Sequence, residues 1–462
     1  MAGQKILRLG TSLAGAFALG VAGLAWTLRR WQPVGDNACA RLTEPVSGDG
    51  EFADLILAGN LQRDTEELAA VRPRNSGTPG EVTAREWVAG RFQDLGLESV
   101  RMEPVIYPRW VGEDARLTLL TWPPEELACL VLSGSAATKD EGLAAPLMDV
   151  GSGQHEVYAE LTPERTRGRI HLAWGGSLHR RDICLNARRA GASGVIVAHP
   201  DPEPVSVDDD DAFLVEAGTS TVFGRLPTVA VSHSVGQRLR TAAQQSSLVR
   251  IEIARRYRLE RAYNVVGELP GRALEYVSLV AHHDAWYAGA ADNAAGVAAI
   301  LAVAEAAFQF ARHTQPRRTL RFVSTAAEEE GLMGALADIA LRGLPVKARC
   351  RGVISLDVVG APGETLWATG WPAQLRGSAV AIGRGLGYEE KTGSRLGIYE
   401  GAIYGDHWPY TQLRIPGLLL GKYPYRFYHT PYDTPDRLDF KDAALHAAIA
   451  GVLALRMANL EL

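Results

Sequence analysis

The stretch YVSLVAHHDAWYAGAADNAAGVAAI, residues 276–300, decides the fold. A short apolar run ends abruptly in HHD at positions 282–284, and after a turn of small residues Asp292 and Asn293 precede an alanine-rich segment. This order predicts a strand, a loop and the start of a helix, which is where open α/β sheets place their ligand sites. Because a carboxylate beside a histidine at a strand end can meet a second carboxylate at a helix start, the stretch predicts half of a metal site.

Composition sets the class of protein but not its chemistry. The chain has 462 residues, of which 47% are hydrophobic and 22% charged, with a formal net charge of -5. The length predicts two or three folded units. The charge balance indicates neither nucleic acid nor an anionic membrane surface as a partner. The cysteines, at positions 39, 129, 184 and 350, lack the spacing of a zinc site or a disulfide framework, although one disulfide is compatible with export.

Residues 1–33 carry the features of a membrane-targeting segment. Lys5 and Arg8 precede an apolar run, and Arg29 and Arg30 follow it. A positive start and a hydrophobic stretch of nearly membrane-spanning length predict a signal-anchor, with the remainder of the chain outside the cytoplasm. A cleaved signal peptide is the alternative. It would have a late cleavage site near position 40 and would leave a secreted or periplasmic protein.

The pattern of strands and helices divides the rest of the chain. Residues 34–113 contain helical segments and a strand, and residues 256–462 alternate strands with helices. Between them, residues 114–255 contain short strands, many turns and one helix, which is typical of an inserted β-rich module. We therefore predict an α/β fold with a mixed, mostly parallel sheet sandwiched by helices. The acidic run at 208–211 lacks the glycine and final glutamate of an EF-hand, which favours a solvated loop.

Four loops in the last segment carry acids and histidines just where predicted strands end. They are HHD (282–284) with Asp292, AEEEG (327–331), LDVVG (356–360) and YHTPYDTPD (428–436). A single acid or histidine in such a place is more often a capping or hydrogen-bonding residue. Four in this order, at the ends of consecutive sheet elements, are hard to explain by capping alone.

These motifs resemble those of the co-catalytic zinc exopeptidases of metallopeptidase family 28, which include bacterial leucyl aminopeptidases and prostate-specific membrane antigen. The resemblance covers nearly all of the chain after residue 54, including RPRNSGTPG at 72–80. The inserted module resembles a protease-associated (PA) domain through the segments GRIHLAWGG (168–176), NARRAGASGVIVAHPDP (186–202) and LPTVAVS (226–232). The resemblance implies a zinc peptidase domain formed by 34–113 and 256–462 and interrupted by a PA domain at 114–255.

The resemblance also implies a role for each acid and histidine of the four loops. Two zinc ions per chain are held by five ligands: His282 and Asp357 on the first ion, Glu329 and His429 on the second, and Asp292 bridging both. Three further residues serve the reaction: Glu328 as general base, Asp284 as the carboxylate that orients His282, and Tyr428 as the phenol that steadies the oxyanion.

The chemistry of peptide hydrolysis is consistent with these roles. Two zinc ions about 3.5–4 Å apart activate a water molecule and polarise the carbonyl group, and a bridging carboxylate sets their separation. Three protein ligands on each ion leave an open position for water. Adjacent glutamates can serve different functions because successive side chains project differently. A carboxylate such as Asp284 fits the rule that the second nitrogen of a ligating imidazole is hydrogen-bonded.

Neighbouring residues of the same motifs are placed outside the ligand set. His283 occupies the variable position of H-x-D, and Glu330 extends AEE beyond the motif, so neither is expected to bind metal. GDHWPY (405–410) resembles a loop of the family, in which Asp406 or His407 either supports the site or serves the fold.

The sequence therefore predicts a zinc-dependent exopeptidase with a peptide substrate, and DVVG (357–360) favours an aminopeptidase. A carboxypeptidase is the first alternative, with the substrate carboxylate recognised by a cation from the set Arg376, Arg384, Lys391 and Arg395. A glutaminyl cyclase-like transferase with one zinc and a non-catalytic receptor-like scaffold are further alternatives, and the complete ligand set argues against both. No sequence feature decides between a monomer and the homodimer that is common in the antigen branch.

Overall fold

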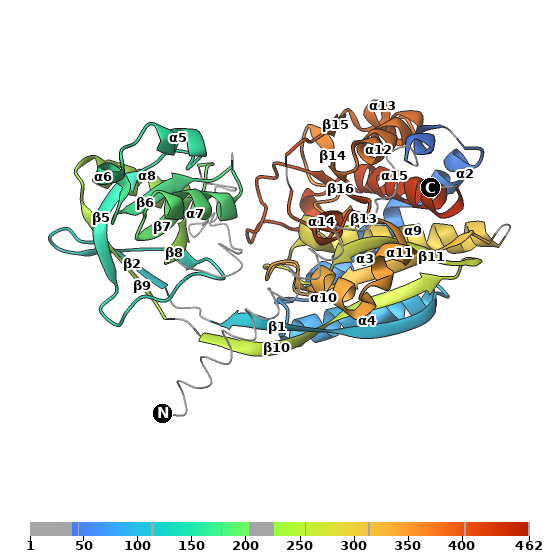
Figure 1. The fold of residues 1–462 in the computed structure, drawn as a ribbon, viewed down its shortest axis with the longest axis horizontal. Coiled ribbons are helices and arrows are strands. Elements are labelled where there is room, and N and C mark those ends of the chain that lie inside the picture. The colour runs from blue at the N-terminus through green and yellow to red at the C-terminus, as the bar shows by residue number, and fades with distance from the viewer. Residues whose placement is uncertain are drawn as a thin grey trace.

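The computed structural model describes residues 39–44, 46–111, 115–176, 178–202, 226–254, 256–312, 315–401 and 403–460. The targeting segment at 1–33 and the acidic run at 208–211 lie outside these residues. The described chain forms two mixed sheets, each with its own helices (Figure 1). A long antiparallel ribbon of β1 (Glu98–Val111) and β10 (Arg256–Leu269) belongs to the larger sheet and carries the chain to the inserted module and back.

The larger sheet is mixed and mostly parallel, as predicted. Within the described residues its strand order is β1, β10, β12 (Arg318–Thr325), β11 (Ala273–His282), β13 (Cys350–Leu356), β16 (Gly417–Lys422), β14 (Thr365–Trp371) and β15 (Arg395–Ile398). The four central strands β12, β11, β13 and β16 run parallel to one another. Their carboxyl ends therefore meet at one edge of the sheet.

Helices cover both faces of this sheet. On one face lie α2 (Asp49–Asp54), α3 (Ala58–Ala70), α4 (Pro79–Asp94), α9 (Ala295–Ala311), α12 (Ala373–Gly385), α13 (Tyr388–Thr392) and α15 (Phe440–Asn459). On the other lie α10 (Met333–Arg342), α11 (Pro345–Arg349) and α14 (Trp408–Gln412). The strand residues alternate accordingly: Leu279 and Ala281 of β11 join the core beneath α9, whereas Val280 joins the core beneath α10.

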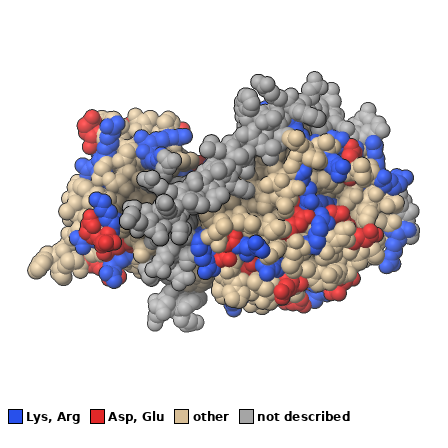
Figure 2. Space-filling model, turned by 60° about the horizontal axis from the view of Figure 1, so that its bottom comes forward, with Lys and Arg blue, Asp and Glu red and all other residues tan. Residues whose placement is uncertain are grey.

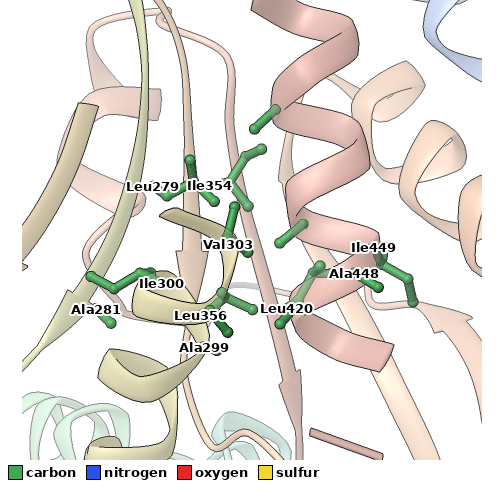
Figure 3. Packing of buried hydrophobic residues seen from close by; sticks show 14 of the residues in the cluster. Leu279, Ala281, Ala299, Ile300, Val303, Ile354, Leu356, Leu420, Ala448 and Ile449 are labelled. Atoms are coloured by element: carbon green, nitrogen blue, oxygen red, sulfur yellow. The ribbon is translucent and has the colours of Figure 1, made fainter. Parts of the chain in front are cut away.

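The alanine-rich segment that follows Asp292 forms the central helix of this core. Figure 3 shows Ala299, Ile300 and Val303 of α9 among the side chains of the central strands, with α15 beside them. Together with the preceding turn, this helix spans Ala290–Ala311 and is the one helix among the described residues that is long and apolar enough to cross a membrane. However, 72% of its apolar window is buried, which is typical of the core helix of a globular domain.

The second sheet is built from the inserted module. Its strand order within the described residues is β3 (Glu125–Leu127), β2 (Ala115–Leu119), β9 (Leu248–Ile253), β5 (Leu143–Asp149), β6 (Ile170–Trp174), β7 (Gly194–Ala198), β8 (Thr228–Val231) and β4 (Leu130–Val131). The sequence predicted one helix here, and α7 (Arg180–Arg189) is that helix. The pattern missed α8 (His233–Gln244) and the short helices α5 (His155–Ala159) and α6 (Pro163–Thr166).

The structure differs from the sequence prediction at two further places. The chain between residues 360 and 416, for which no fold was predicted, contains β14, β15 and helices α12 to α14. The regular part of α9 begins at Ala295 rather than at Asp292, after an irregular turn at Ala290–Ala294. Asp292 (φ -119°, ψ 83°) and Asn293 (φ -143°, ψ 41°) have non-helical backbone angles. The main chain at Asp292 therefore departs from the helix just where a site residue is expected.

The distribution of surface charge and the state of the cysteines are those of an ordinary globular protein. Figure 2 shows positive and negative side chains interspersed over the visible face of the described chain. No disulfide joins the four cysteines, all of which lie within the described residues. Burial raises the pKa of the Cys184 and Cys350 thiols to about 12. Both therefore behave as small apolar core residues.

Candidate metal centre

The five expected metal ligands come together at the carboxyl edge of the four central strands. His282 is the last residue of β11, Asp357 directly follows β13, and Glu329 lies in the loop after β12. Asp292 comes from the irregular turn before α9, and His429 from the loop after β16. All five residues are buried, and each is at most 7% exposed. Adjacent parallel strands thus bring residues that are up to 147 positions apart into one buried cluster.

The cluster consists of two groups of three residues that share Asp292. In the first, His282 Nε2 lies 3.1 Å from Asp292 Oδ1 and 3.8 Å from Asp357 Oδ1. In the second, His429 Nε2 lies 2.8 Å from Asp292 Oδ2 and 3.1 Å from Glu329 Oε2. In each group, one atom from each residue lies within 4.8 Å of the others. Asp292 therefore presents one carboxylate oxygen to each group.

The donor atoms of the cluster fit zinc. Within the described part of the chain, the buried atoms His282 Nε2, Asp292 Oδ2 and Asp357 Oδ1 make no well-formed hydrogen bond. Buried polar atoms without a hydrogen bond are costly and need a physical explanation. Imidazole nitrogens and carboxylate oxygens are zinc ligands, and three from the protein leave a position open. Each of the two groups can therefore hold one zinc ion.

The two histidines and Asp292 favour one another's charged forms. Burial disfavours the charged form of His429, but Glu329 and Asp292 outweigh it and raise its pKa to about 9. Burial likewise opposes the charge on His282, and Glu328, Asp292 and Asp357 still raise its pKa well above the usual value. Burial raises the pKa of Asp292, yet the two imidazoles outweigh it and lower that pKa. The cluster thus stabilises positive charge, as a cation site must.

Glu328 lies beside the cluster but belongs to neither ligand group. Burial raises its pKa well above the usual value; the charge on His282 opposes this shift, and the neighbouring carboxylates of Glu329, Asp406 and Asp357 add to it. A carboxyl group whose pKa is strongly perturbed by burial and by neighbouring charges is a candidate for acid–base chemistry. The position and environment of Glu328 therefore suit a general base.

Asp284 supports the site in a different way from the one expected. The ring nitrogen Nδ1 of His282 lies 2.9 Å from the backbone oxygen of Asp284 and 3.8 Å from its carboxylate. The carboxylate instead accepts hydrogen bonds from the backbone N–H groups of Glu328 at 3.2 Å and Glu329 at 3.4 Å. The main chain of Asp284 thus orients the imidazole, while its side chain fixes the loop that carries the two glutamates.

Two tyrosines border the cluster. The ring of Tyr428 stacks on His429 with a centroid separation of 3.7 Å, and the ring of Tyr423 lies 6.0 Å from Tyr428 in an edge-on arrangement. Burial, reinforced by nearby carboxylates, raises the pKa of both phenols well above the usual value. Both phenols therefore keep their protons and can act as hydrogen-bond donors. Tyr423 carried no signal in the sequence, because it lies outside the recognised motif.

The inserted module contributes residues to this site. Arg180, at the start of α7, is only 6% exposed, and its Nη2 lies 2.9 Å from His429 Nδ1. Its guanidinium lies 5.7 Å from the centre of the Tyr428 ring. Ser133 Oγ donates to Glu330 Oε2 at 3.1 Å. The module therefore reaches the loops of this site, and one of the residues it contributes is a buried cation.

The remaining residues singled out from the sequence lie around the cluster. His283 turns away from it, with Nδ1 3.0 Å from Ser324 Oγ and Nε2 3.5 Å from Glu81 Oε1. Asp406 accepts a hydrogen bond from Thr325 Oγ1 at 2.5 Å, and burial raises its pKa to about 7. Burial lowers the pKa of His407 to about 3. These three residues are buried and belong to neither ligand group.

The four cations named for a carboxypeptidase lie elsewhere. Arg376 donates to Glu400 at 2.7 Å, and Arg395 lies 3.9 Å from Glu364. Arg384 and Lys391 are exposed on α12 and α13. Within the described residues, none of the four forms a hydrogen bond or ion pair with the two ligand groups. Among the described residues, Arg180, which sequence reasoning missed, does lie against a candidate ligand, His429.

Two more buried residues that sequence reasoning missed hold the loop before α9. Asp433 accepts hydrogen bonds from the backbone N–H groups of Ala291 at 2.8 Å and Asp292 at 3.1 Å. Arg74 donates to backbone oxygens earlier in the same loop, including that of His283 at 2.9 Å. Both lie within motifs already quoted, YHTPYDTPD and RPRNSGTPG, so charged residues inside these motifs were the available signal.

Known proteins share this organisation. Residues 264–454 match Peptidase family M28, and residues 123–239 match the PA domain. The chain is 25% identical to human carboxypeptidase Q over 453 residues, covering 91% of each protein. It is 24% identical to the aminopeptidase YwaD of Bacillus subtilis over 303 residues, 64% of this chain and 60% of the relative.

A solved structure has the same fold at low sequence identity. BSAP, a zinc aminopeptidase from Bacillus subtilis, superposes with a TM-score of 0.63 at 21% identity, covering 88% of this chain and 98% of that protein. The PA-domain match lies within the chain that builds the peptidase fold. This order and the shared fold agree with the resemblance seen in the motifs. These matches support an M28-type metallo-exopeptidase with an inserted PA domain.

Proposed function

We propose that this protein is an exopeptidase that hydrolyses peptide bonds with two zinc ions per chain. The observation that carries this proposal is the placement of Asp292, whose two carboxylate oxygens lie 3.1 Å from His282 Nε2 and 2.8 Å from His429 Nε2. A carboxylate shared between two ligand groups is what a two-metal hydrolytic site needs. BSAP is described as a zinc aminopeptidase, and the ligand chemistry of this chain also suits zinc.

Glu328 is the proposed general base. Two zinc ions, when bound, supply an activated water and polarise the scissile carbonyl group. Glu328 takes the proton from the attacking water and returns it to the leaving amine. The Asp284 carboxylate keeps Glu328 in place by accepting its backbone N–H at 3.2 Å. Tyr428, whose phenol keeps its proton, donates a hydrogen bond to the developing oxyanion.

The two non-hydrolytic alternatives receive less support. A glutaminyl cyclase-like transferase with one zinc needs only one ligand group, whereas this chain has two. A receptor-like scaffold has no use for a buried carboxyl group with a raised pKa beside such a cluster. Two zinc ions per chain together with peptide hydrolysis would distinguish the proposed function from both.

Arg180 favours a carboxypeptidase over the aminopeptidase that DVVG suggested. A buried guanidinium beside His429 and Tyr428 can bind the free carboxylate at the C-terminus of a peptide and would repel a protonated α-amine. When His429 binds a metal through Nε2, its neutral ring carries the proton on Nδ1. Nδ1 then offers Arg180 no acceptor, and the guanidinium can donate to a substrate carboxylate. We therefore place the C-terminal residue of the substrate next to Arg180.

An aminopeptidase remains the second candidate, because the chain is similar to the aminopeptidase YwaD. A paired panel of short peptides decides between the two. One set has a free N-terminus and a blocked C-terminus, the other has the reverse, and both are offered to the zinc-loaded fragment that starts after residue 33. We expect cleavage of the peptides with a free C-terminus. Cleavage of the first set alone would establish an aminopeptidase.

Replacing Arg180 with alanine is expected to raise KM for peptides with a free C-terminus by about 10- to 100-fold, because a charge-assisted bond is worth about 1.5–3 kcal/mol. Lysine at this position should restore only part of the affinity, since it lacks the planar fork. Arg181 stacks 4.6 Å from the Tyr404 ring and serves as the matched control. Equal KM changes in the Arg180 and Arg181 variants would count against carboxylate recognition.

The sequence also supports proposals for the domain boundaries and for the cellular location of the protein. We propose that the peptidase domain is formed by residues 34–113 and 256–462, with the PA domain at 114–255. We also propose that the segment 1–33 anchors the protein to the membrane, or directs its export and is then removed, so that the body works outside the cytoplasm. Membrane fractionation of the full chain beside the fragment lacking 1–33 tests this placement, and sedimentation of the fragment tests the homodimer.

A further inference from the structure

A buried arginine of the RPRNSGTPG segment is joined to the metal-site loop by three hydrogen bonds. Arg74, between α3 and α4, is fully buried. Its Nε donates to the backbone oxygen of His283 at 2.9 Å, its Nη2 to that of Gly289 at 2.6 Å, and its Nη1 to that of Ala288. All three acceptors lie in the short loop between His282 and Asp292. One rigid side chain thus binds both ends of this loop.

The loop has little freedom around this guanidinium. Gly289 has a φ of +48°, a left-handed conformation that favours glycine, and a Cβ there would lie 2.3 Å from the backbone oxygen of Asp292 and 3.1 Å from Arg74 Nη2. On the far side of the loop, Asp433 holds the N–H groups of Ala291 and Asp292. The main chain leading to Asp292 is therefore held from both sides, by donors of Arg74 and by acceptors of Asp433.

The charge of Arg74 also suits this place. Burial lowers its pKa to about 10, and the nearby carboxylates of Asp433, Asp284, Asp292 and Glu329 oppose the shift. The guanidinium therefore remains charged at neutral pH. It offsets part of the negative charge of a carboxylate-rich site without competing for the ligand atoms, because its hydrogen bonds go to backbone oxygens.

We propose that Arg74 is a positioning residue for the bridging carboxylate: by fixing the backbone oxygens of His283, Ala288 and Gly289, it places Asp292 between the two metal-binding groups. This inference rests on the proposed two-zinc function. It predicts that the planar fork of the side chain is needed as well as its charge, since a lysine ammonium cannot reach three carbonyl groups spread along a loop. Groups that orient metal ligands typically contribute about 10- to 100-fold in metal affinity or activity.

The test compares R74K and R74M with the native protein. For each, zinc affinity is measured by competition with a chelator, and the visible spectrum of the cobalt-substituted protein is recorded as a probe of coordination geometry. We expect zinc to bind about 10- to 100-fold more weakly in both variants, with an altered cobalt spectrum. We also expect kcat to fall while KM changes little, because Arg74 does not face the substrate.

Arg318 provides a matched control. It is a buried arginine that donates to the backbone oxygens of Met457 at 2.9 Å and Leu460 at 2.6 Å, at the opposite end of β12 from the site. R318K should lower the melting temperature but leave zinc affinity and the cobalt spectrum unchanged. If R74K binds zinc like the native protein, or does not fold even with zinc present, the positioning role is refuted. If the native protein itself fails to bind two zinc ions, the proposed function is refuted instead.

Discussion

Replacing Glu328 with glutamine is expected to abolish most of the turnover while leaving both zinc ions bound. Glu328 belongs to neither ligand group, so the metal-binding atoms are unchanged in the variant. An amide cannot take a proton from the attacking water, and a positioned general base typically contributes about 10²- to 10⁴-fold to the rate. The measurement is kcat for the best peptide of the panel, together with the zinc content of the same preparation.

The neighbouring glutamate is the control for this result. Glu330 accepts a hydrogen bond from Ser133 of the inserted module at 3.1 Å, and the oxygen of a glutamine can accept the same bond. E330Q is therefore expected to retain turnover and both metals. Retained activity in E328Q would remove Glu328 from the role of base. Loss of activity in E330Q instead would mean that the assignment within the EEE motif is shifted by one or two residues.

Replacing Asp292 with alanine is expected to release both zinc ions. Each ion would lose one of its three protein ligands, and the two imidazoles would lose the carboxylate they share. Because residues that merely orient ligands already contribute about 10- to 100-fold, loss of a shared ligand should weaken binding by more than about 100-fold at each position. Zinc content after dialysis against a weak chelator measures this directly.

Variants of the unshared ligands test whether the loss of both ions is specific to Asp292. D357A removes a ligand of the first group only, and E329A a ligand of the second group only. Each is expected to retain one zinc ion per chain, compared with two in the native protein and none in D292A. A D292A protein that still holds two zinc ions would contradict the bridging role, and equal losses in all three variants would indicate general collapse of the site.

Much of the fold and of the candidate site could be predicted from local sequence. The apolar runs of β11, β12, β13 and β16 end in HHD, AEEEG, LDVVG and YHTPYDTPD within a few residues, so each strand carries its own polar loop. Parallel strands put these loops at one edge. That much depends only on hydrophobic patterning and on which residue types follow it. The strands β14 and β15 were missed because both are short and a glycine interrupts the pattern of each.

Local sequence gave no information on backbone conformation at the site. Ala327, Val358 and His429 all have left-handed backbones, with φ of 55°, 53° and 58°. Such conformations are unfavourable for residues other than glycine and persist only when the surrounding structure enforces them. Two of them directly adjoin Glu328 and Asp357, and the third is itself an expected ligand. The directions in which these side chains point were therefore set by packing.

The sequence by itself determined the α/β class, the inserted module and the acids and histidines of the site, because these follow from periodicity and from motifs confined to short segments. Only the tertiary structure decided which distant residues meet them. Arg180 reaches His429 across 249 positions of the chain, and Arg74 reaches His283 across 209. Such contacts arise when separate elements pack, and no pattern within either segment encodes its partner. The candidate ligands could therefore be named from motifs, whereas their contacts with Arg180 and Arg74 became visible only in the folded chain.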